Sequence, residues 1–234
     1  MMPYLRRLIL ALLTLLLTPF HVLLAAVLLL FNLADRLTRL LRRPAPVEET
    51  PLSGLVTIVI LNWNGKDLLA EGVPSVVEAV RQDGRPHEIL VVDNGSSDGS
   101  VEYIRTALPQ VRILELPDNL GFACGNNAGV KAARHDMVVL LNNDMIVDPG
   151  FLRPLLECFG PRTFAVASQI HHQDPAVRRE ETGRTTAAFR RGLIDYAHCE
   201  VAAPECARPF YPAFWAGGGA SAFHRRRFLL LGGF

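Results

Sequence analysis

Short apolar runs alternate along this chain with segments of helical periodicity. The runs at residues 55–61, 88–92 and 137–141 are continuous and rich in β-branched residues or leucine, as in strands covered on both faces of a parallel sheet. The run at 111–116 alternates more between apolar and polar residues, which favours a place nearer a sheet edge. These four runs predict the strands of one sheet.

Helical patterns lie between the predicted strands. Apolar residues recur at helix spacing within 69–80 and 101–108, and Ser97 or Asp98 is a suitable N-cap for the second helix. The alternation is completed by helices at 126–134 and 151–159 and by a strand at 163–168. Because strands that alternate with helices imply right-handed crossovers, the predicted fold class is α/β, with a Rossmann-like, doubly wound and mostly parallel sheet.

The N-terminal segment has a different pattern. Residues 8–31 carry no formal charge and would be apolar on every side of a helix. At about 1.5 Å per residue, such a helix is long enough to cross a bilayer core of about 30 Å. No small-residue cleavage site precedes the arginines that follow, so we expect a retained membrane helix rather than a cleaved signal peptide.

Arginines flank this apolar segment on both sides. Two precede it and four follow it, which favours a cytoplasmic location for the rest of the chain. Pro19 removes a hydrogen bond near the middle of the helix, so a re-entrant hairpin with both ends cytoplasmic is an alternative. We favour a single span.

Composition divides the chain into three parts. Residues 1–43 are the anchor with its basic flanks and hold six arginines against one aspartate. Residues 44–53 are proline-rich and aperiodic, as in a linker, and residues 54–234 are the globular domain. These last two parts hold 18 basic against 22 acidic residues, which argues against a nucleic-acid partner. The cysteines form no C-x-x-C pair of the kind that binds zinc.

Polar clusters follow the predicted strands, at the sheet edge where open α/β proteins form ligand crevices. Asn62 and Asn64 follow the first strand, and their amides can bind a base edge or a ribose, although simple turn chemistry is an alternative. Asp93 ends the second strand, where its carboxylate can accept a hydrogen bond from the imide N–H of uracil or thymine. Asp98 and the serines beside it are expected to cap the next helix.

A glycine-rich segment precedes the fourth strand. Gly121, Gly125 and Gly129 have the spacing G-x3-G-x3-G, which is neither the dinucleotide fingerprint nor a P-loop. We expect these glycines to allow close approach of the backbone to a ligand, with Asn119 and Asn126 in contact with it.

Asn142, Asn143 and Asp144 follow the fourth strand. Mg²⁺ or Mn²⁺ prefers oxygen ligands and often takes only one or two protein carboxylates, while nucleotide phosphates complete the shell. We expect Asp144 to bind such an ion and the two asparagines to contact the ligand. A β-turn cluster ahead of Asp148 is the alternative. Farther along, the arginine-rich stretch at 177–192, which contains Glu180 and Glu181, is predicted to be a solvated loop.

Four motifs in order, VTIVILNWNG, VVDNGSSDGS, DNLGFACGNNAG and LLNNDMIVDPGFL, resemble those of family 2 glycosyltransferases with the GT-A fold, in particular bacterial rhamnosyltransferase-like members. The resemblance covers about residues 55–234. It implies an inverting, metal-assisted transfer from a UDP- or dTDP-sugar, with Asp93 at the base and Asp144 at the metal. The implied acceptor is a lipid-linked or cell-envelope glycan, at the cytoplasmic face of a bacterial inner membrane.

The chain departs from this family pattern in two places. Asn142 stands where many relatives have the first acid of Asp-x-Asp, and its amide can bond a ribose but supplies no charge. In relatives, a Gly-Gly-Phe like that at 232–234 is followed by the acidic pair that contains the catalytic base. The base is therefore expected beyond Phe234, since no convincing substitute lies upstream. The alternative function is a catalytically silent donor-binding or scaffold protein at the membrane. A nucleotidyltransferase fits less well, because it would need a basic, glycine-rich loop after the first strand.

Overall fold

The structure is a computed structural model that describes residues 2–41, 52–172, 184–190, 192–199 and 211–234. It contains two compact units, Met1–Thr50 and Pro51–Phe234. The predicted linker at 44–53 lies outside the described residues except for its last two positions, and so do Glu180 and Glu181.

The first unit is one helix, α1 (Met2–Leu41), which is unbroken at Pro19. Its stretch Leu5–Thr38 is long and apolar enough to cross a membrane, by length and composition. The polar side chains of Thr14 and Thr18 bond carbonyl groups one turn earlier, at 2.8 and 2.7 Å, which satisfies them within the helix. The helix does not turn back at the proline.

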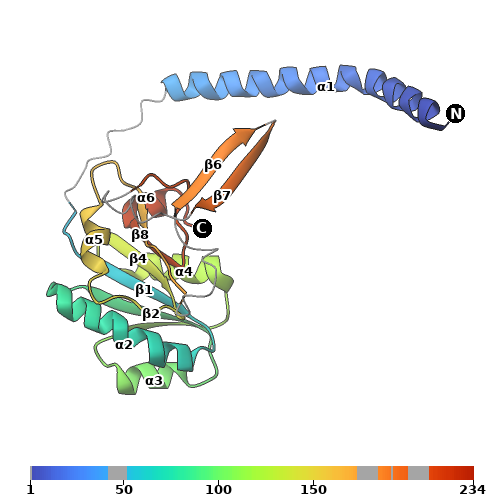
Figure 1. Cartoon of the computed structure of the whole chain (residues 1–234). Helices are drawn as coiled ribbons and strands as arrows, with labels where there is room; N and C mark the ends of the chain where they lie inside the picture. The colour runs from blue at the N-terminus through green and yellow to red at the C-terminus, as the bar shows by residue number, and fades with distance from the viewer. Residues whose placement is uncertain (1, 42–51, 173–183, 191, 200–210) are drawn as a thin grey trace. The chain divides into compact units, whose positions relative to one another are not determined.

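The second unit is built on a six-stranded sheet of order β3-β2-β1-β4-β8-β5 (Figure 1). Its strands are β1 (Val56–Asn62), β2 (Glu88–Asn94), β3 (Arg112–Leu116), β4 (Met137–Asn142), β5 (Ala165–Ala167) and β8 (Ala220–His224). β1 to β4 pair in parallel, whereas β8 runs antiparallel to β4 and β5. The predicted mostly parallel α/β sheet is confirmed, and so is the edge position of the third strand.

Helices cover both faces of this sheet. They are α2 (Lys66–Asp83), α3 (Ser100–Ala107), α4 (Gly121–Ala132), α5 (Leu152–Glu157) and α6 (Arg225–Leu230). Because side chains alternate along a strand, Ile58 of β1 packs in a core with α2, α3 and α5, while the adjacent Val59 packs in a second core with α4 and α6. The sheet is therefore doubly wound, as the sequence predicts.

Two further strands, β6 (Arg184–Arg190) and β7 (Leu193–Cys199), form a separate antiparallel hairpin (Figure 1). The sequence prediction of a solvated loop over 177–192 is wrong for the part that forms β6. Threonine, alanine and phenylalanine dominate that part, and they pair with a second strand that starts at Leu193.

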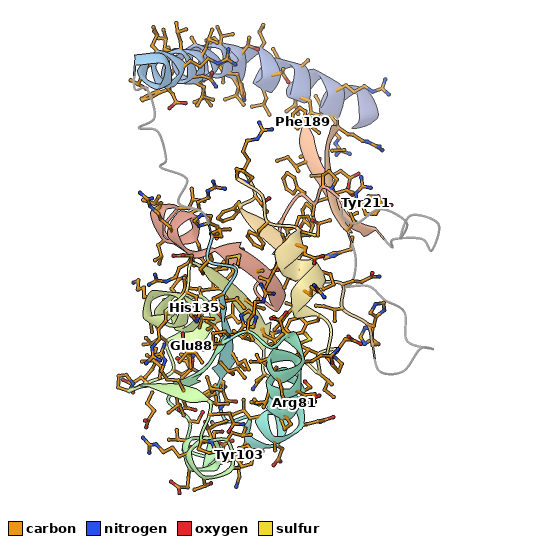
Figure 2. All side chains as sticks on the ribbon, turned by 90° about the vertical axis from the view of Figure 1, so that its left-hand side faces the viewer. Arg81, Glu88, Tyr103, His135, Phe189 and Tyr211 are labelled. Carbon is orange, nitrogen blue, oxygen red and sulfur yellow. The ribbon has the colours of Figure 1, made fainter. Side chains whose placement is uncertain are left out.

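The amino ends of the strands form a closed polar edge. Glu88, at the start of β2, accepts hydrogen bonds from Thr57 at 2.7 Å and from Arg112 at 2.7 Å. His135 lies near Glu88 (Figure 2), and its backbone N–H donates to the Thr57 hydroxyl at 3.3 Å. Burial opposes ionisation of Glu88, but these hydrogen bonds outweigh it and hold the pKa of the carboxyl below its usual value. The polar groups of this edge thus bond one another. The residues that are expected to bind a ligand lie at the opposite edge.

Candidate functional site

The carboxyl ends of β1, β2 and β4 are joined by a chain of side-chain hydrogen bonds. Asn62 donates through Nδ2 to Asp93 Oδ1 at 3.3 Å, and its Oδ1 accepts from Asn143 Nδ2 at 2.9 Å. The strand register explains this contact, because Asn62 pairs with Asp93 across β1 and β2. The structure therefore brings together three of the residues that the sequence places at the ends of the strands. We call Asp93, Asn62 and Asn143 the strand-end chain.

Hydrogen bonding separates the roles within the strand-end chain, since Asn62 and Asp93 are both buried. Asn62 is 1% exposed, and its second donor bonds the Ser96 hydroxyl at 3.3 Å, so the amide that is expected to contact a ligand is engaged within the protein in this structure. Asp93 is 2% exposed, and its Oδ2 accepts the Ser96 backbone N–H at 2.9 Å. A carboxylate has about four acceptor positions, so Asp93 keeps acceptor capacity for a further N–H. Asn62 positions the strand ends rather than facing the crevice.

Asn64 fastens the loop after β1 to the loop after β2. Its φ of 48° lies in the left-handed region, which asparagine adopts more readily than most residues. The Asn64 N–H donates to the Ser96 hydroxyl at 2.9 Å, and its Oδ1 accepts from Ser97 N at 2.8 Å. Ser96 therefore connects both loops, a role that the sequence analysis missed and that a serine just after a strand end only hints at.

Asp98 holds the starts of two helices. Its Oδ1 accepts the N–H of Ser100, the first residue of α3, at 3.0 Å, although Gly99 rather than the predicted Asp98 stands at the N-cap position. Its Oδ2 accepts the N–H of Lys66, the first residue of α2, at 2.9 Å. Burial opposes ionisation of Asp98, yet the hydrogen bonds from Ser100 and Lys66 outweigh it and lower the pKa of the carboxyl.

Asn94, which the sequence analysis did not select, holds the loop before α4. Its Nδ2 donates to Asn119 Oδ1 at 2.8 Å, and its Oδ1 accepts the Leu120 N–H at 2.9 Å. Asn119 Oδ1 also accepts the N–H of Gly121, the first residue of α4, at 2.8 Å. A Cβ on Gly95 would lie 2.8 Å from the Asp118 carbonyl carbon, so only glycine lets this loop approach β2 so closely. Asn119 and Gly121 stand exposed at the crevice edge.

The glycine spacing in α4 serves packing instead of ligand approach at two of its three positions. The helix begins at Gly121, five residues before the predicted start. A Cβ on Gly125 would lie 2.5 Å from a Leu61 methyl, and one on Gly129 would lie 2.4 Å from a Val59 methyl, so both glycines let α4 pack closely on β1. The side chain of Asn126, which is expected to contact a ligand, is 1% exposed and donates to the Phe122 carbonyl at 3.0 Å.

The residues after β4 differ in how they are held. The Asn142 N–H donates to the Gly219 carbonyl at 2.9 Å, which ties the end of β4 to the segment before β8. Asn143 belongs to the strand-end chain. Asp144 is exposed, and no hydrogen bond or ion pair with another described residue engages its carboxylate. The site thus presents one available carboxylate at the end of a central strand.

This donor set fits one kind of metal site. Among the described residues, no three His, Cys, Asp or Glu side chains lie close enough together to hold an ion by themselves. Mg²⁺ and Mn²⁺ do not need such a cage, since they are often bound by one or two carboxylates together with substrate phosphates and water. Asp144 would then be the protein ligand, and the phosphates would supply the other charges.

A groove of about 1300 Å³ lies beside β5, β8 and the base of the hairpin. Aromatic side chains dominate its wall, namely those of Phe151, Phe159, Phe164, Tyr211, Phe214, Trp215, Phe223, Phe228 and Phe234. Arg184 adds a positive charge and lies 5.7 Å from the centre of the Tyr211 ring. At one end, Phe234 is bonded through its backbone to Asn127 of α4, at 3.1 and 3.2 Å. A largely apolar groove lined by one cation, Arg184, and one anion, Glu157, therefore adjoins the elements that carry the crevice.

An open, doubly wound α/β sheet with polar side chains at the carboxyl ends of its strands is the class of protein that binds ligands at that edge. Residues 57–208 match the model of Glycosyl transferase family 2, and the chain belongs to this family. The family expected from the four motifs is thereby confirmed.

Relatives and a solved structure agree with this assignment. The succinoglycan biosynthesis protein ExoO of Rhizobium meliloti (strain 1021) is 33% identical over 116 residues, which cover 49% of this chain and 31% of that protein. An undecaprenyl-phosphate 4-deoxy-4-formamido-L-arabinose transferase of Pectobacterium carotovorum subsp. carotovorum (strain PC1) is 29% identical over 169 residues, 62% of this chain and 51% of that one. This chain therefore spans about a third to a half of the length of these relatives.

The solved structure is the mannosyltransferase PcManGT from Pyrobaculum calidifontis in complex with GDP-Man and Mn²⁺. It superposes with a TM-score of 0.53 at 22% identity, over 85% of this chain and 53% of that one. At this identity the likeness speaks for the fold alone, and it confirms the expected GT-A fold.

Proposed function

We propose that this chain is an inverting glycosyltransferase that moves a sugar from a UDP- or dTDP-sugar to a lipid-linked or cell-envelope glycan. The observation that carries the proposal is the available Asp144 carboxylate beside the strand-end chain, at the ligand edge of a GT-A sheet. Membership of the family supports the reaction type.

Each residue of the crevice has a proposed role. Asp93 accepts the imide N–H of the base, and Asp144 binds Mg²⁺ or Mn²⁺. The ion, when bound, neutralises charge on the diphosphate leaving group. The remaining contacts to the nucleotide-sugar come from Asn64, Asn119, Gly121, Asn142 and Asn143, while Asn62 orders Asp93 and Asn143 from behind.

The groove beside β8 is the proposed acceptor side. Aromatic rings offer flat apolar surfaces that suit either a sugar face or a lipid chain, and Arg184 can pair with an anionic group such as a lipid phosphate. The name of the Pectobacterium relative includes an undecaprenyl phosphate, which supports a lipid-linked acceptor. Helix α1 would anchor the chain in a membrane with the second unit on the cytoplasmic side, near such an acceptor.

Nucleotide titration of the full chain in detergent micelles with Mn²⁺ tests the donor assignment. UDP and CDP carry the same phosphates, but cytosine lacks the imide N–H that Asp93 is proposed to accept. We expect UDP or dTDP to bind about tenfold more tightly than CDP, consistent with one hydrogen bond to a charged group. Asp93→Asn keeps an oxygen acceptor for Ser96 but removes the charge, so it should reduce this preference. Equal binding of UDP, dTDP and CDP by the wild type would contradict the assignment.

A further inference from the structure

The β6–β7 hairpin has one apolar face and one mixed face. Phe189 pairs directly with Ile194, and Ala187 pairs with Tyr196. Side chains on paired residues share a face, and positions two apart along a strand share it too. These four residues therefore form one continuous apolar surface, which we call the hairpin face. The other side carries Arg190 together with a mixture of polar and apolar residues.

The hairpin face is exposed. Phe189, Ile194 and Tyr196 are 76%, 62% and 70% exposed. Figure 2 shows Phe189 near the far end of the hairpin. A two-stranded hairpin is marginally stable by itself, and an exposed apolar patch that includes large side chains usually marks a surface that something covers.

The base of the hairpin is firmly attached to the rest of the second unit. The Thr185 hydroxyl donates to the Trp215 carbonyl at 2.9 Å, and the Trp215 N–H donates back to that hydroxyl at 3.0 Å. The Tyr196 and His198 rings lie edge-on to the Trp215 ring, with centroids 6.0 and 5.2 Å away. The base of the hairpin is thus attached to the rest of the second unit, while the outer half of the hairpin exposes apolar side chains.

We propose that the hairpin face docks into the interfacial layer of a lipid membrane. Three observations select lipid as the partner. The exposed apolar side chains lie next to Arg190 at the end of β6, and this combination of apolar side chains and an arginine is typical of segments that insert shallowly into anionic leaflets. Phe189 and Ile194 can enter the acyl boundary while Arg190, on the opposite side, stays with the headgroups.

The other two observations come from the rest of the chain. Helix α1 is long and apolar enough to cross a membrane. Only ten residues separate Leu41 from Leu52, so the chain tethers the second unit to any membrane that holds the helix. The hairpin face is a second contact with that membrane and does not depend on glycosyl transfer.

Depth-dependent fluorescence quenching tests this proposal. The full chain carrying Phe189→Trp is reconstituted into vesicles of phosphatidylethanolamine and phosphatidylglycerol, with or without bromine on the acyl chains. We expect the emission that this substitution adds to the Trp63 and Trp215 background to be largely lost in brominated vesicles. Tyr103→Trp on α3 is the matched control, and its added emission should be retained. Because position 189 is 76% exposed, the substitution should leave the melting temperature unchanged.

The outcomes separate the hairpin from the anchor. Arg190→Gln in the Phe189→Trp chain should weaken quenching in anionic vesicles at low salt and have no effect in zwitterionic ones. Co-sedimentation with vesicles without quenching at position 189 would overturn the hairpin proposal and leave the anchor intact. Concentration-dependent self-association that shields position 189 from lipid would also overturn it, by assigning the face to a second copy. A chain that neither co-sediments nor shows quenching would overturn both.

Discussion

The residues at the carboxyl edge of the sheet fall into those that build the crevice and those that stay available in it. Asn62 engages both of its donors and its carbonyl oxygen with Asp93, Ser96 and Asn143 at 1% exposure. A buried amide that makes all these bonds fixes the distance between strand ends, because any shift leaves a polar group without a partner. Asp144 differs from Asn62, because its carboxylate is exposed and does not hold the strand ends together.

Asn62→Ala should destabilise the second unit. The substitution leaves buried Asp93 without one donor and Asn143 without its acceptor, which costs about 1–3 kcal/mol. Thermal melting of the full chain should show the loss as a fall of several degrees in Tm. Asn127→Ala, which removes only the bonds to Phe234, is the control and should lower Tm less. Equal melting of Asn62→Ala and wild type would contradict the role of Asn62.

Strand-end position alone predicts which side chains meet, but not which of them face a ligand. Asn62, Asp93 and Asn143 meet because parallel strands end at the same edge. Burial of Asn62 depends on the neighbouring Ser96 loop folding over it, and the role of Asn94 depends on a loop 25 residues away. Such long-range loop contacts leave no periodic signal in the sequence.

At the scale of elements, helix α4 shows how a spacing can have two meanings. Residues four apart lie on one face of a helix, so Gly121, Gly125 and Gly129 mark a small-residue face as readily as a ligand loop. The structure places the last two against Leu61 and Val59 of β1. The apolar runs of β1 to β4 are predicted correctly because burial on both faces leaves a continuous pattern. The β6–β7 hairpin is missed because its exposed strands mix arginine with apolar residues.

Gly129→Ala should destabilise the fold although alanine is the better helix former by about 1 kcal/mol. The new methyl would stand 2.4 Å from a Val59 methyl and 2.8 Å from one of Val92, and such overpacking typically costs about 1–3 kcal/mol. In a Val59→Ala background part of the clash disappears, so Gly129→Ala should cost less there. A double-mutant cycle of urea unfolding measures this coupling. Additive effects would mean that α4 does not pack on β1 through this pair.

His87 links the end of α2 to the start of β1 through hydrogen bonds that its neutral imidazole makes. Its Nδ1 accepts the Val56 N–H at 3.1 Å, so Nε2 carries the proton and donates to Asp83 at 2.7 Å. Burial lowers the pKa of His87 below its usual value, although Asp83 opposes the shift. The unfolded imidazole takes up a proton below about pH 6.5 while the folded one stays neutral, so stability should fall as pH drops from there toward the folded pKa.

Urea unfolding at a series of pH values measures this effect. His87→Gln should remove this part of the pH dependence, whereas His135→Gln at the same edge should retain it. A wild-type stability that is constant or rises as the pH falls below about 6.5 would contradict the neutral, buried assignment of His87.

The whole chain combines a long apolar helix with a GT-A unit, and each is described independently. The predicted anchor rests on the length and composition of Leu5–Thr38, which are sufficient to cross a membrane. The second unit has its own two cores and requires no contribution from α1 to form them.

Leu16→Arg with Leu23→Arg should release the chain from membranes. An arginine at the centre of a span costs about 2.5–3.5 kcal/mol on insertion scales, so two of them remove much of the driving force. Thr38→Arg, at the end of the apolar stretch where arginine is tolerated, is the matched control. Carbonate extraction should recover the double variant in the soluble fraction and the control with the membranes. Recovery of both in the membrane fraction would contradict anchoring by α1.

The central claim is that Asp144 supplies the protein ligand for a divalent ion that helps bind the donor nucleotide. Calorimetric titration of the full chain with UDP or dTDP, in Mn²⁺ and again in EDTA, measures it most directly. We expect removal of Mn²⁺ to weaken wild-type binding about tenfold or more, and Asp144→Asn in Mn²⁺ to bind as weakly as wild type in EDTA. Asp148→Asn, a nearby exposed carboxylate that caps its own turn, should bind like wild type. Unchanged Mn²⁺-dependent binding by Asp144→Asn would contradict the claim.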